Sequence, residues 1–332
     1  MTEVQWKGRN VLVTGAGGFI GSHLVEELLT RGAKVTALVR YNSRNSWGWL
    51  DGRYRASQPN LSVMLGDVTD AQLVHAAVTG KQTVFHLAAL IGIPYSYAAP
   101  SSYVQTNVIG TLNVLQACRE MGVDRMVHTS TSEVYGSAQY TPIDERHPLV
   151  GQSPYSASKI GADKLAESFH RSFDLPVVIL RPFNTYGPRQ SARAVIPAII
   201  TQALTSDTVR LGTLDPVRDF TFVADSVDGF IRAAESEEAV GRTVHTGSGR
   251  GVTIGALAVM ILQQTNPRAK IVTESGRVRP EMSEVQQLIC NNALAKSVLA
   301  WEPRVTLEAG IAKTVAWVRE HLDVYKASAY AV

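Results

Sequence analysis

The chain has 332 residues, of which 45% are hydrophobic and 18% are charged, and its formal net charge is +3. This composition suits a globular protein with one large or two modest cores, and the small net charge excludes the strong basic field of a nucleic-acid partner. The two cysteines, Cys118 and Cys290, lie far apart in apolar surroundings, so we expect neither a disulfide framework nor a metal site. No apolar stretch reaches the roughly 18 residues of a membrane span, and residues 1–10 are polar, so we expect a cytoplasmic protein with no membrane partner.

Short apolar runs alternate with longer amphipathic segments through the first half of the chain. This order is typical of an α/β fold in which helices cover both faces of a parallel sheet. We therefore predict a Rossmann-type doubly wound sheet that binds its ligands at the carboxyl ends of the strands. The predicted strands are residues 10–14, 34–39, 61–65, 83–87, 125–129 and 177–181, and the predicted helices are 22–30, 102–121 and 157–173.

The pattern changes after Arg181, where proline and glycine become frequent and the apolar runs shorten. This change predicts a smaller C-terminal substrate-binding lobe built from excursions out of the sheet. The elements expected after Arg181 are helices at 195–204, 225–235, 254–264 and 306–324, a strand at 220–223 and a turn at 301–303. We assign residues 1–183 and 218–247 to a dinucleotide-binding domain, and residues 184–217 and 248–328 to the lobe.

A glycine-rich turn follows the first predicted strand, and helical spacing resumes directly after it. Such a unit places backbone N–H groups at the positive end of a helix dipole, where a pyrophosphate binds. Gly15 permits the tight turn, Gly18 lets the phosphates approach, and Gly21 lets the helix pack closely on the strand. The expected cofactor contacts in this turn are Gly15, Gly17, Gly18, Phe19, Ile20 and Gly21.

The end of the second strand bears on the choice of dinucleotide. An acidic residue there binds the adenosine ribose of NAD, but Arg40 stands at this place, followed by Asn42, Ser43 and Arg44. A guanidinium beside the ribose suits a 2′-phosphate, so NADP is favoured; NAD stays open, because solvated loop charges are the alternative for both arginines. Asp67, before Val68, is placed either beside the adenine amino group or as a helix cap. The remaining predicted cofactor contacts are Val68, Leu87, Ala88 and Ala89 at the ends of the third and fourth strands, together with Tyr155 and Lys159.

Two further segments carry groups suited to proton transfer. Tyr155 and Lys159 lie four residues apart at the start of a predicted helix, which places the phenol and the ammonium on one helix face. The ammonium and the positive ring of a bound cofactor lower the pKa of the phenol and make it a base near neutral pH. Thr131 and Glu133 follow a predicted strand at the ligand-binding edge. We expect Thr131 to hydrogen-bond a substrate hydroxyl that Tyr155 deprotonates, and Glu133 to add a carboxylate to the same crevice.

Together these motifs resemble a known family, the extended short-chain dehydrogenase/reductases that act on sugar nucleotides. The resemblance covers essentially the whole chain and rests on Thr14-Gly-x-Gly-Gly-x-Ile-Gly21, Thr131, Tyr155-x-x-x-Lys159 and Arg218-Asp-Phe-x-x-Val-x-Asp225. Within the family, Thr131-Ser-Glu133 is similar to the 4,6-dehydratases. Residues 41–50, 86–97 and 181–193 look closer still to dehydratases of the legionaminic-acid type, which act on nucleotide-linked N-acetylglucosamine.

The resemblance implies an internal redox dehydration with a tightly bound, recycled dinucleotide. Tyr155 would take the proton of the sugar 4-hydroxyl as hydride passes to the nicotinamide; Glu133 would take the carbon-5 proton, and water would leave carbon 6. Glucose-type enzymes carry Asp where this chain has Ser132, so Glu133 is expected also to protonate the leaving hydroxyl, as in mannose-type enzymes. Thr-Ser-Glu occurs in UDP-glucuronate decarboxylases too. A decarboxylase, a 4-epimerase and a catalytically silent NADP-binding sensor therefore stay open as alternatives.

The same resemblance implies that the lobe binds a UDP- or GDP-linked sugar. Tyr95 and Ser96 are expected to border the sugar, and the diphosphate or nucleoside contacts are expected from Asn184, Arg189, Arg193, Arg218 and Arg279. For Arg189 and Arg193 a surface salt bridge is an equal alternative. The helices at 102–121 and 157–173 would form a four-helix homodimer interface.

Four other residues receive structural interpretations. We expect His86 and His128 to be packed histidines and Asn107 to hold active-site backbone. The loop tryptophans Trp47 and Trp49 either cover the cofactor or anchor the core.

Overall fold

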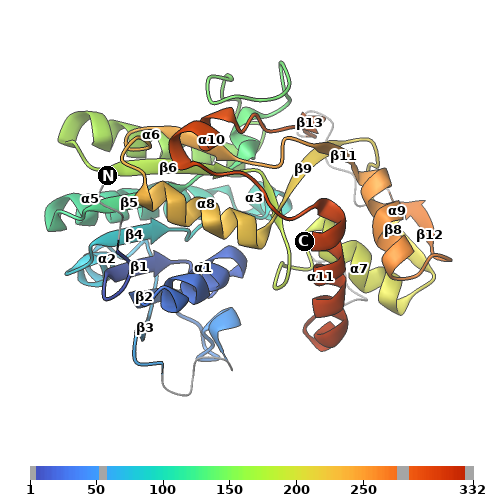
Figure 1. Cartoon of the computed structure of the whole chain (residues 1–332), viewed down its shortest axis with the longest axis horizontal. Helices are drawn as coiled ribbons and strands as arrows, with labels where there is room; N and C mark the ends of the chain where they lie inside the picture. The colour runs from blue at the N-terminus through green and yellow to red at the C-terminus, as the bar shows by residue number, and fades with distance from the viewer. Residues whose placement is uncertain (1–4, 52–57, 275–283, 326–332) are drawn as a thin grey trace.

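A seven-stranded sheet dominates the structure, a computed structural model that describes residues 5–51, 58–274 and 284–325 (Figure 1). All of its strands are parallel, in the order β10-β6-β5-β4-β1-β2-β3. The strand order reverses beside β1, so the carboxyl ends of β1 and β4 form the crevice where doubly wound folds bind ligands. The predicted fold class is thus confirmed. The strands are β1 Asn10–Thr14, β2 Lys34–Arg40, β3 Leu61–Gly66, β4 Thr83–His86, β5 Arg125–Thr129, β6 Val177–Pro182 and β10 Thr243–Thr246.

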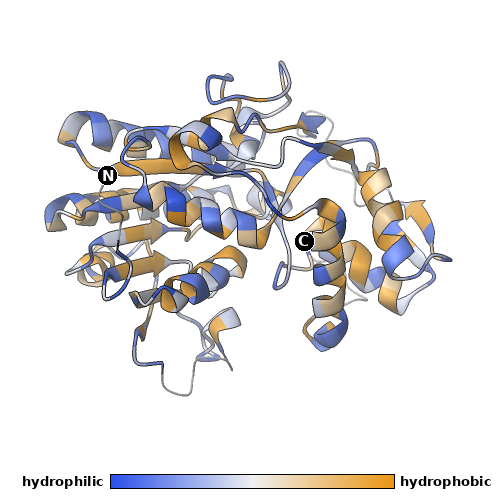
Figure 2. Ribbon diagram, viewed as in Figure 1, coloured by the Kyte–Doolittle hydropathy of each residue, from blue (hydrophilic) through white to orange (hydrophobic). Residues whose placement is uncertain are grey.

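Helices cover both faces of this sheet. On one face lie α1 (Phe19–Thr30) and α8 (Val223–Glu235); on the other lie α2 (Ala71–Val78), α5 (Gly110–Met121) and α6 (Pro154–Phe173). Alternate residues of β1 serve the two faces, because Val11 and Val13 pack with the first pair of helices and Leu12 packs with the second group. The strands are accordingly rich in apolar residues, and the helices show apolar and polar sides (Figure 2).

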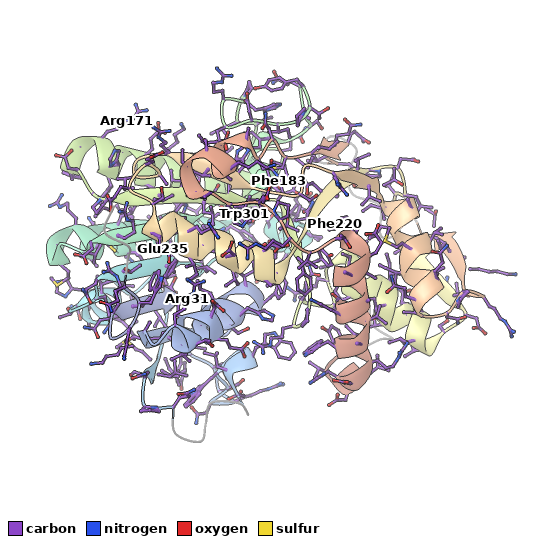
Figure 3. The ribbon with its side chains drawn as sticks, viewed as in Figure 1. Arg31, Arg171, Phe183, Phe220, Glu235 and Trp301 are labelled. Atoms are coloured by element: carbon purple, nitrogen blue, oxygen red, sulfur yellow. The ribbon has the colours of Figure 1, made fainter. Side chains whose placement is uncertain are left out.

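An ion pair joins the ends of α1 and α8. The Arg31 guanidinium lies 3.4 Å from Glu235, which also accepts a hydrogen bond from the indole of Trp6 (Figure 3). The pair fixes the two helices of this face against each other at the end remote from the crevice.

The helix predicted over residues 102–121 forms, but it is not α-helical throughout. The chain forms α3 (Ile93–Ala98) and α4 (Pro100–Tyr103), then a π-helical turn, η2 (Val104–Ile109), before α5 begins at Gly110. A π-helical turn is wider than an α-helical one and is common at functional sites. Here it places Asn107 against the carboxyl edge of the sheet: its side chain accepts from Leu90 N (2.8 Å) and donates to Leu90 O (2.9 Å). The expected role of Asn107 in holding backbone is confirmed.

A second lobe carries two small sheets. One joins β7 (Asn184–Tyr186), β9 (Val217–Phe222), β11 (Gly251–Thr253) and β13 (Gln287–Leu288), and the other joins β8 (Thr208–Leu211) to β12 (Lys270–Thr273). The helices of this part of the chain are α7 (Val195–Thr205), α9 (Ile254–Gln264), α10 (Ala293–Leu299) and α11 (Leu307–Glu320); α7, α9 and α11 stand together beside the main sheet (Figure 1). Strand β9 was expected in the dinucleotide-binding domain, which we began again at residue 218. It pairs instead with β7, β11 and β13, so the return to the main sheet begins with α8.

The buried Trp301 connects the lobe to α8. Its indole donates to the carbonyl of Asp225, and Val305 N donates to the carboxylate of the same residue (Figure 3). In the described part of the chain, no helix has both the length and the apolarity needed to cross a membrane. Nor do the described residues include a cluster of three or more His, Cys, Asp or Glu side chains able to hold a metal ion.

Candidate active site

The glycine-rich turn between β1 and α1 has no room for side chains. Gly15 has a φ of +69°, and a Cβ on it would lie 2.8 Å from Ala88 N; a Cβ on Gly21 would lie 2.3 Å from the carbonyl oxygen of Gly15. The first turn of α1 carries no acidic residue, so nothing there opposes the positive end of the helix dipole. The turn is therefore shaped as a cradle for a pyrophosphate, which fits a dinucleotide cofactor.

The segment after β4 lies against this turn. Leu87 N and Ala88 N both donate to the hydroxyl of Thr14, at 3.2 and 3.1 Å, and His86 Nδ1 lies 2.8 Å from the same oxygen. Residues 87–89 are thus held beside the glycines at the carboxyl edge of the sheet. The other nitrogen of His86 bonds to Thr111, and burial lowers the pKa of this imidazole well below its usual value, so His86 is the packed histidine that we expected.

The loop after β2 is ordered by Asn42. Its side-chain oxygen accepts from Arg44 N and Ser46 N, and its amide donates to the carbonyls of Arg40 and Ser46. Asn42 therefore shapes the loop through its own backbone contacts, while Ser43 and Arg44 face solvent.

Arg40 lines a cavity of about 320 Å³ to which the π-helical turn also contributes. Its side chain is 77% exposed, and its guanidinium lies 3.8 Å from Asp67. Asp67 accepts from the amide and hydroxyl of Thr69 and does not cap α2; that cap is Asp70. The cavity is lined by Arg40, Asp67, Thr69, Leu90, Tyr95, Ser101, Ser102, Gln105 and Thr106.

The two loop tryptophans anchor the core. Trp49 N donates to Gly17 O (3.0 Å), and its ring meets Trp317 of α11 edge to face with 5.3 Å between centroids. Trp47 packs on the main core, and its carbonyl covers Gly17. The loop is thereby fastened to the glycine-rich turn on one side and to the lobe on the other.

The groups expected to transfer protons lie together at the ends of β5 and α6. A capping box of Ser153 and Ser156 starts α6, which places Tyr155 in its first turn. Thr131 caps the 3₁₀ turn η3 (Ser132–Tyr135) by accepting from Glu133 N, and its hydroxyl also hydrogen-bonds the phenol of Tyr155. Glu133 is half-buried and its charge acts on Tyr155, whereas Ser132 is fully buried.

Lys159 lies one turn further along α6 than Tyr155, and its side chain is buried. Its ammonium donates to the carbonyl of Thr129 (2.6 Å), and burial lowers the pKa of Lys159 to about 8. Burial also raises the pKa of Tyr155, against a smaller lowering from its bond to Thr131. The protein alone therefore keeps the phenol protonated.

Two further tyrosines, Tyr103 and Tyr95, follow one another beside Tyr155. The ring of Tyr103 lies 6.2 Å from that of Tyr155, and Tyr95 follows at 6.1 Å from Tyr103. Arg193 reaches the same place, because its charge acts on Tyr103 and its guanidinium lies 3.8 Å from where a Cβ on Gly92 would stand. The hydroxyl of Ser96, in contrast, donates to Ile93 O inside α3, and its side chain is buried.

The residues expected to bind the nucleotide divide into several groups. Among the described residues, the side-chain amide of Asn184 is a buried donor without a hydrogen-bond partner, which suits a ligand oxygen. Arg218 is buried 3.3 Å from Glu284. Arg189 bonds to Glu26 (2.7 Å) and Ser22 on α1, which is the salt-bridge alternative for this residue. Arg279 lies outside the described residues.

Sequence reasoning missed a buried charge cluster behind Lys159. Asp163 lies one turn further along α6 and is bonded to His128 (3.1 Å), Ser130 (2.5 Å) and Arg181 (2.7 Å). Asp163 and Lys159 are four residues apart, a spacing that could have revealed the cluster. His128 is the packed histidine that we expected, and burial lowers its pKa.

A family described as GDP-mannose 4,6 dehydratase matches residues 12–314. The chain belongs to this family. It lies within the extended short-chain dehydrogenase/reductases, the sugar-nucleotide epimerases and dehydratases that the motifs predicted.

Curated relatives of the family include both dehydratases and epimerases. The chain is 33% identical to a dTDP-glucose 4,6-dehydratase of Streptomyces antibioticus, with 94% of this chain and 93% of the relative covered. It is also 33% identical to a UDP-glucose 4-epimerase of Mycolicibacterium smegmatis, with coverages of 93% and 98%.

Solved structures extend the similarity to the whole fold. The dTDP-glucose 4,6-dehydratase of Streptomyces venezuelae, solved with NAD bound, has a TM-score of 0.85 at 31% identity and covers 96% of this chain and 99% of its own. A UDP-N-acetylglucosamine 4-epimerase of Methanobrevibacter ruminantium, in complex with UDP-N-acetylmuramic acid, has a TM-score of 0.86 at 30% identity, with coverages of 95% and 99%. The chain is thus similar to dehydratases and epimerases of nucleotide sugars.

Proposed function

We propose that the protein is a 4,6-dehydratase of a nucleotide-linked N-acetylglucosamine, with UDP or GDP as the nucleotide. The observation that carries the proposal is the half-buried Glu133, whose backbone N donates to Thr131 and whose charge acts on Tyr155. A dehydratase needs a base for carbon 5 beside the group that acts on the 4-hydroxyl, and Glu133 supplies one.

The residues of the chain divide the reaction between them. Tyr155, oriented by Thr131, takes the proton of the 4-hydroxyl. Glu133 takes the proton of carbon 5, which the 4-ketone makes acidic, and delivers it to the 6-hydroxyl so that water leaves. Carbon 5 then regains a proton from solvent. A dinucleotide held by the glycine-rich turn would supply the hydride chemistry between carbon 4 and carbon 6, with no net redox change. Asn184 donates its unpaired amide to the diphosphate or nucleoside, and Arg193 and Tyr95 border the sugar.

A 4-epimerase is the second candidate, favoured by the similarity to the epimerase of Mycolicibacterium smegmatis. It uses the same tyrosine at carbon 4 but leaves carbon 5 and carbon 6 unchanged, so Glu133 would have no chemical task. The two reactions differ in product mass, because only the dehydratase releases water.

The deciding experiment is incubation of the purified protein with UDP- and GDP-N-acetylglucosamine without added cofactor, followed by mass spectrometry. We expect one of them to lose one water without net cofactor reduction, which also identifies the nucleotide. An unchanged mass with a new sugar epimer would make the protein an epimerase. Loss of carbon dioxide from UDP-glucuronate, with both N-acetylglucosamine substrates unchanged, would make it a decarboxylase.

For the resident cofactor we propose NAD. The NADP preference expected from Arg40 and Arg44 finds no support in the Streptomyces venezuelae structure, whose cofactor is NAD. Asp67 lies 3.8 Å from Arg40, and its negative charge would repel a 2′-phosphate held there. Chromatography of the nucleotides released by denaturing the purified protein tests this: NAD supports the proposal, and NADP restores the original preference.

We also propose a homodimer that packs α5 and α6 against their copies. Val104 and Phe173 are each 48% exposed, and Val108 and Leu112 are half-buried between them in sequence. An apolar stripe of this kind suits a helix–helix interface.

A further inference from the structure

Asp163 bonds to His128 and Ser130, the residues on either side of Thr129, whose carbonyl binds Lys159. Its carboxylate accepts from Ser130 Oγ at 2.5 Å and lies 3.1 Å from His128 Nε2, while Arg181 Nη2 donates to it at 2.7 Å. Between His128 and Ser130 stands Thr129, whose carbonyl receives the Lys159 ammonium at 2.6 Å. The end of β5 is therefore fastened to α6 on either side of that carbonyl.

This arrangement joins the two halves of the catalytic group. Tyr155, Lys159 and Asp163 lie on successive turns of α6, whereas Thr129 and Thr131 lie on the strand end that Asp163 holds. Without these bonds, the direction of the Thr129 carbonyl and the place of Thr131 beside the phenol depend on backbone pairing and on the bond from Arg181 Nε to Ser130 Oγ (3.1 Å). Small displacements of this kind are costly in catalysis.

We propose that Asp163 is a positioning residue: it fixes residues 128–131 so that Thr129 receives the Lys159 ammonium and Thr131 meets Tyr155. The kinetic part of this inference rests on the proposed function. The claim that Asp163 holds residues 128–131 in place does not, because it concerns the end of β5 and can be measured without substrate.

Several other charged or titratable groups face Lys159. They are Arg181 on β6, His128 on β5 and His86 on β4, and burial keeps both imidazoles neutral by lowering their pKa. Arg181 lowers the pKa of Lys159, and Asp163 opposes it. Removing the negative charge of Asp163 therefore lowers the pKa of Lys159 below about 8, and activity that needs the ammonium is lost at lower pH than before.

The test compares the holoenzyme with Asp163→Asn and with the control Glu145→Gln, a buried carboxyl that bonds to His245 outside this segment. For Asp163→Asn we expect kcat to fall about 100-fold with KM little changed. The alkaline limb of kcat should move down by about one pH unit. Hydrogen exchange of residues 128–131 should become faster, and Glu145→Gln should show none of these changes.

A second variant separates the bonds from the charge. Ser130→Ala removes one of the bonds to Asp163 and leaves its charge, so we expect faster exchange at residues 128–131 and a lower kcat, with the alkaline limb unmoved. Ser130→Ala also tests the proposal if Asp163→Asn does not fold. Hydrogen-exchange rates at residues 128–131 and a kcat equal to those of the wild type in Ser130→Ala would overturn the proposal. An unmoved alkaline limb in a folded Asp163→Asn would overturn the part that concerns charge.

The exchange measurement needs no substrate, so it separates this inference from the proposed function. A wild-type protein that converts no nucleotide sugar defeats the proposed function. The exchange rates still decide whether Asp163 holds the strand end.

Discussion

Tyr155 stands in surroundings that oppose its ionisation. Burial raises the pKa of the phenol, the carboxylates of Glu133 and Asp163 raise it further, and the bond to Thr131 only partly compensates. The phenolate therefore becomes accessible when positive charge is added beside it, which is what a bound oxidised nicotinamide supplies. We therefore expect the base proposed at Tyr155 to act only in the protein that holds the dinucleotide.

Replacing Tyr155 with Phe removes this base and leaves the shape of the ring. We expect kcat to fall about 10²- to 10⁴-fold while the bound dinucleotide remains. Mass spectrometry of the product and chromatography of the released cofactor measure the two effects. Tyr140→Phe, at an exposed phenol, is the matched control, and wild-type turnover in Tyr155→Phe would show that the protein acts without this base.

Replacing Glu133 with Gln should stop the reaction after carbon 4 has been oxidised. We expect overall turnover to fall about 100-fold, the solvent deuterium found at carbon 5 of the product to disappear, and the absorbance of reduced nicotinamide to accumulate. The control is Glu320→Gln at an exposed carboxylate. Unchanged turnover in Glu133→Gln would contradict the role of this residue and favour the 4-epimerase.

Individual residues could be predicted where one local motif determines them. Gly15 and Gly21 follow from the turn that they form, and Tyr155 follows from the start of α6. The direction of the Lys159 ammonium could not be predicted, because it depends on the carbonyl of Thr129, 30 residues away in sequence. The pairing of Arg189 with Glu26 is likewise a long-range contact that the chain order does not reveal.

At the scale of elements, the π-helical turn η2 is the feature that departs most from the predicted helix. It lets Asn107 pair with both backbone groups of Leu90 and with Ser158 on α6. Three pieces of backbone around the crevice thus depend on one amide side chain. Apolar periodicity continues through the turn, so the sequence pattern predicted a regular helix.

Replacing Asn107 with Ala leaves the partly buried backbone groups of Leu90 without their partner. We expect a loss of stability of about 1–3 kcal/mol, seen as a lower thermal midpoint. Gln105→Ala, at an exposed position in the same turn, should cost less than about 0.5 kcal/mol. Equal midpoints for the two variants would show that water replaces the amide.

The strands of the second lobe illustrate a different limit. Strand β13 has two residues and β7 and β11 have three each, too short to show a period in sequence. They form because β9 offers them partners, and β10 likewise joins the main sheet by pairing with β6. The long apolar strands β1, β2 and β5, in contrast, were predicted to within a residue at each end.

For the whole molecule, the proposed dimer is the main unobserved property. Replacing Val104 with Arg places a charge in the proposed interface, so we expect the mass in solution to fall from dimer to monomer by light scattering. Val259→Arg is a matched control, because Val259 is 49% exposed on α9 of the other lobe and Val104 is 48% exposed. A dimer that survives Val104→Arg would exclude this part of the α5–α6 face.

The contact between Trp49 and Trp317 should give the protein an intrinsic fluorescence signal that reports on this part of the structure. One indole belongs to the loop bonded to Gly17, and the other belongs to α11 of the lobe. The fluorescence of this pair should therefore depend on the distance between the glycine-rich turn and the lobe. Withdrawal of the dinucleotide should change the intrinsic emission, and Trp317→Phe should remove that change. Loading could then be followed in real time without a label, and an emission that stays constant would mean that the loop and α11 move as one body.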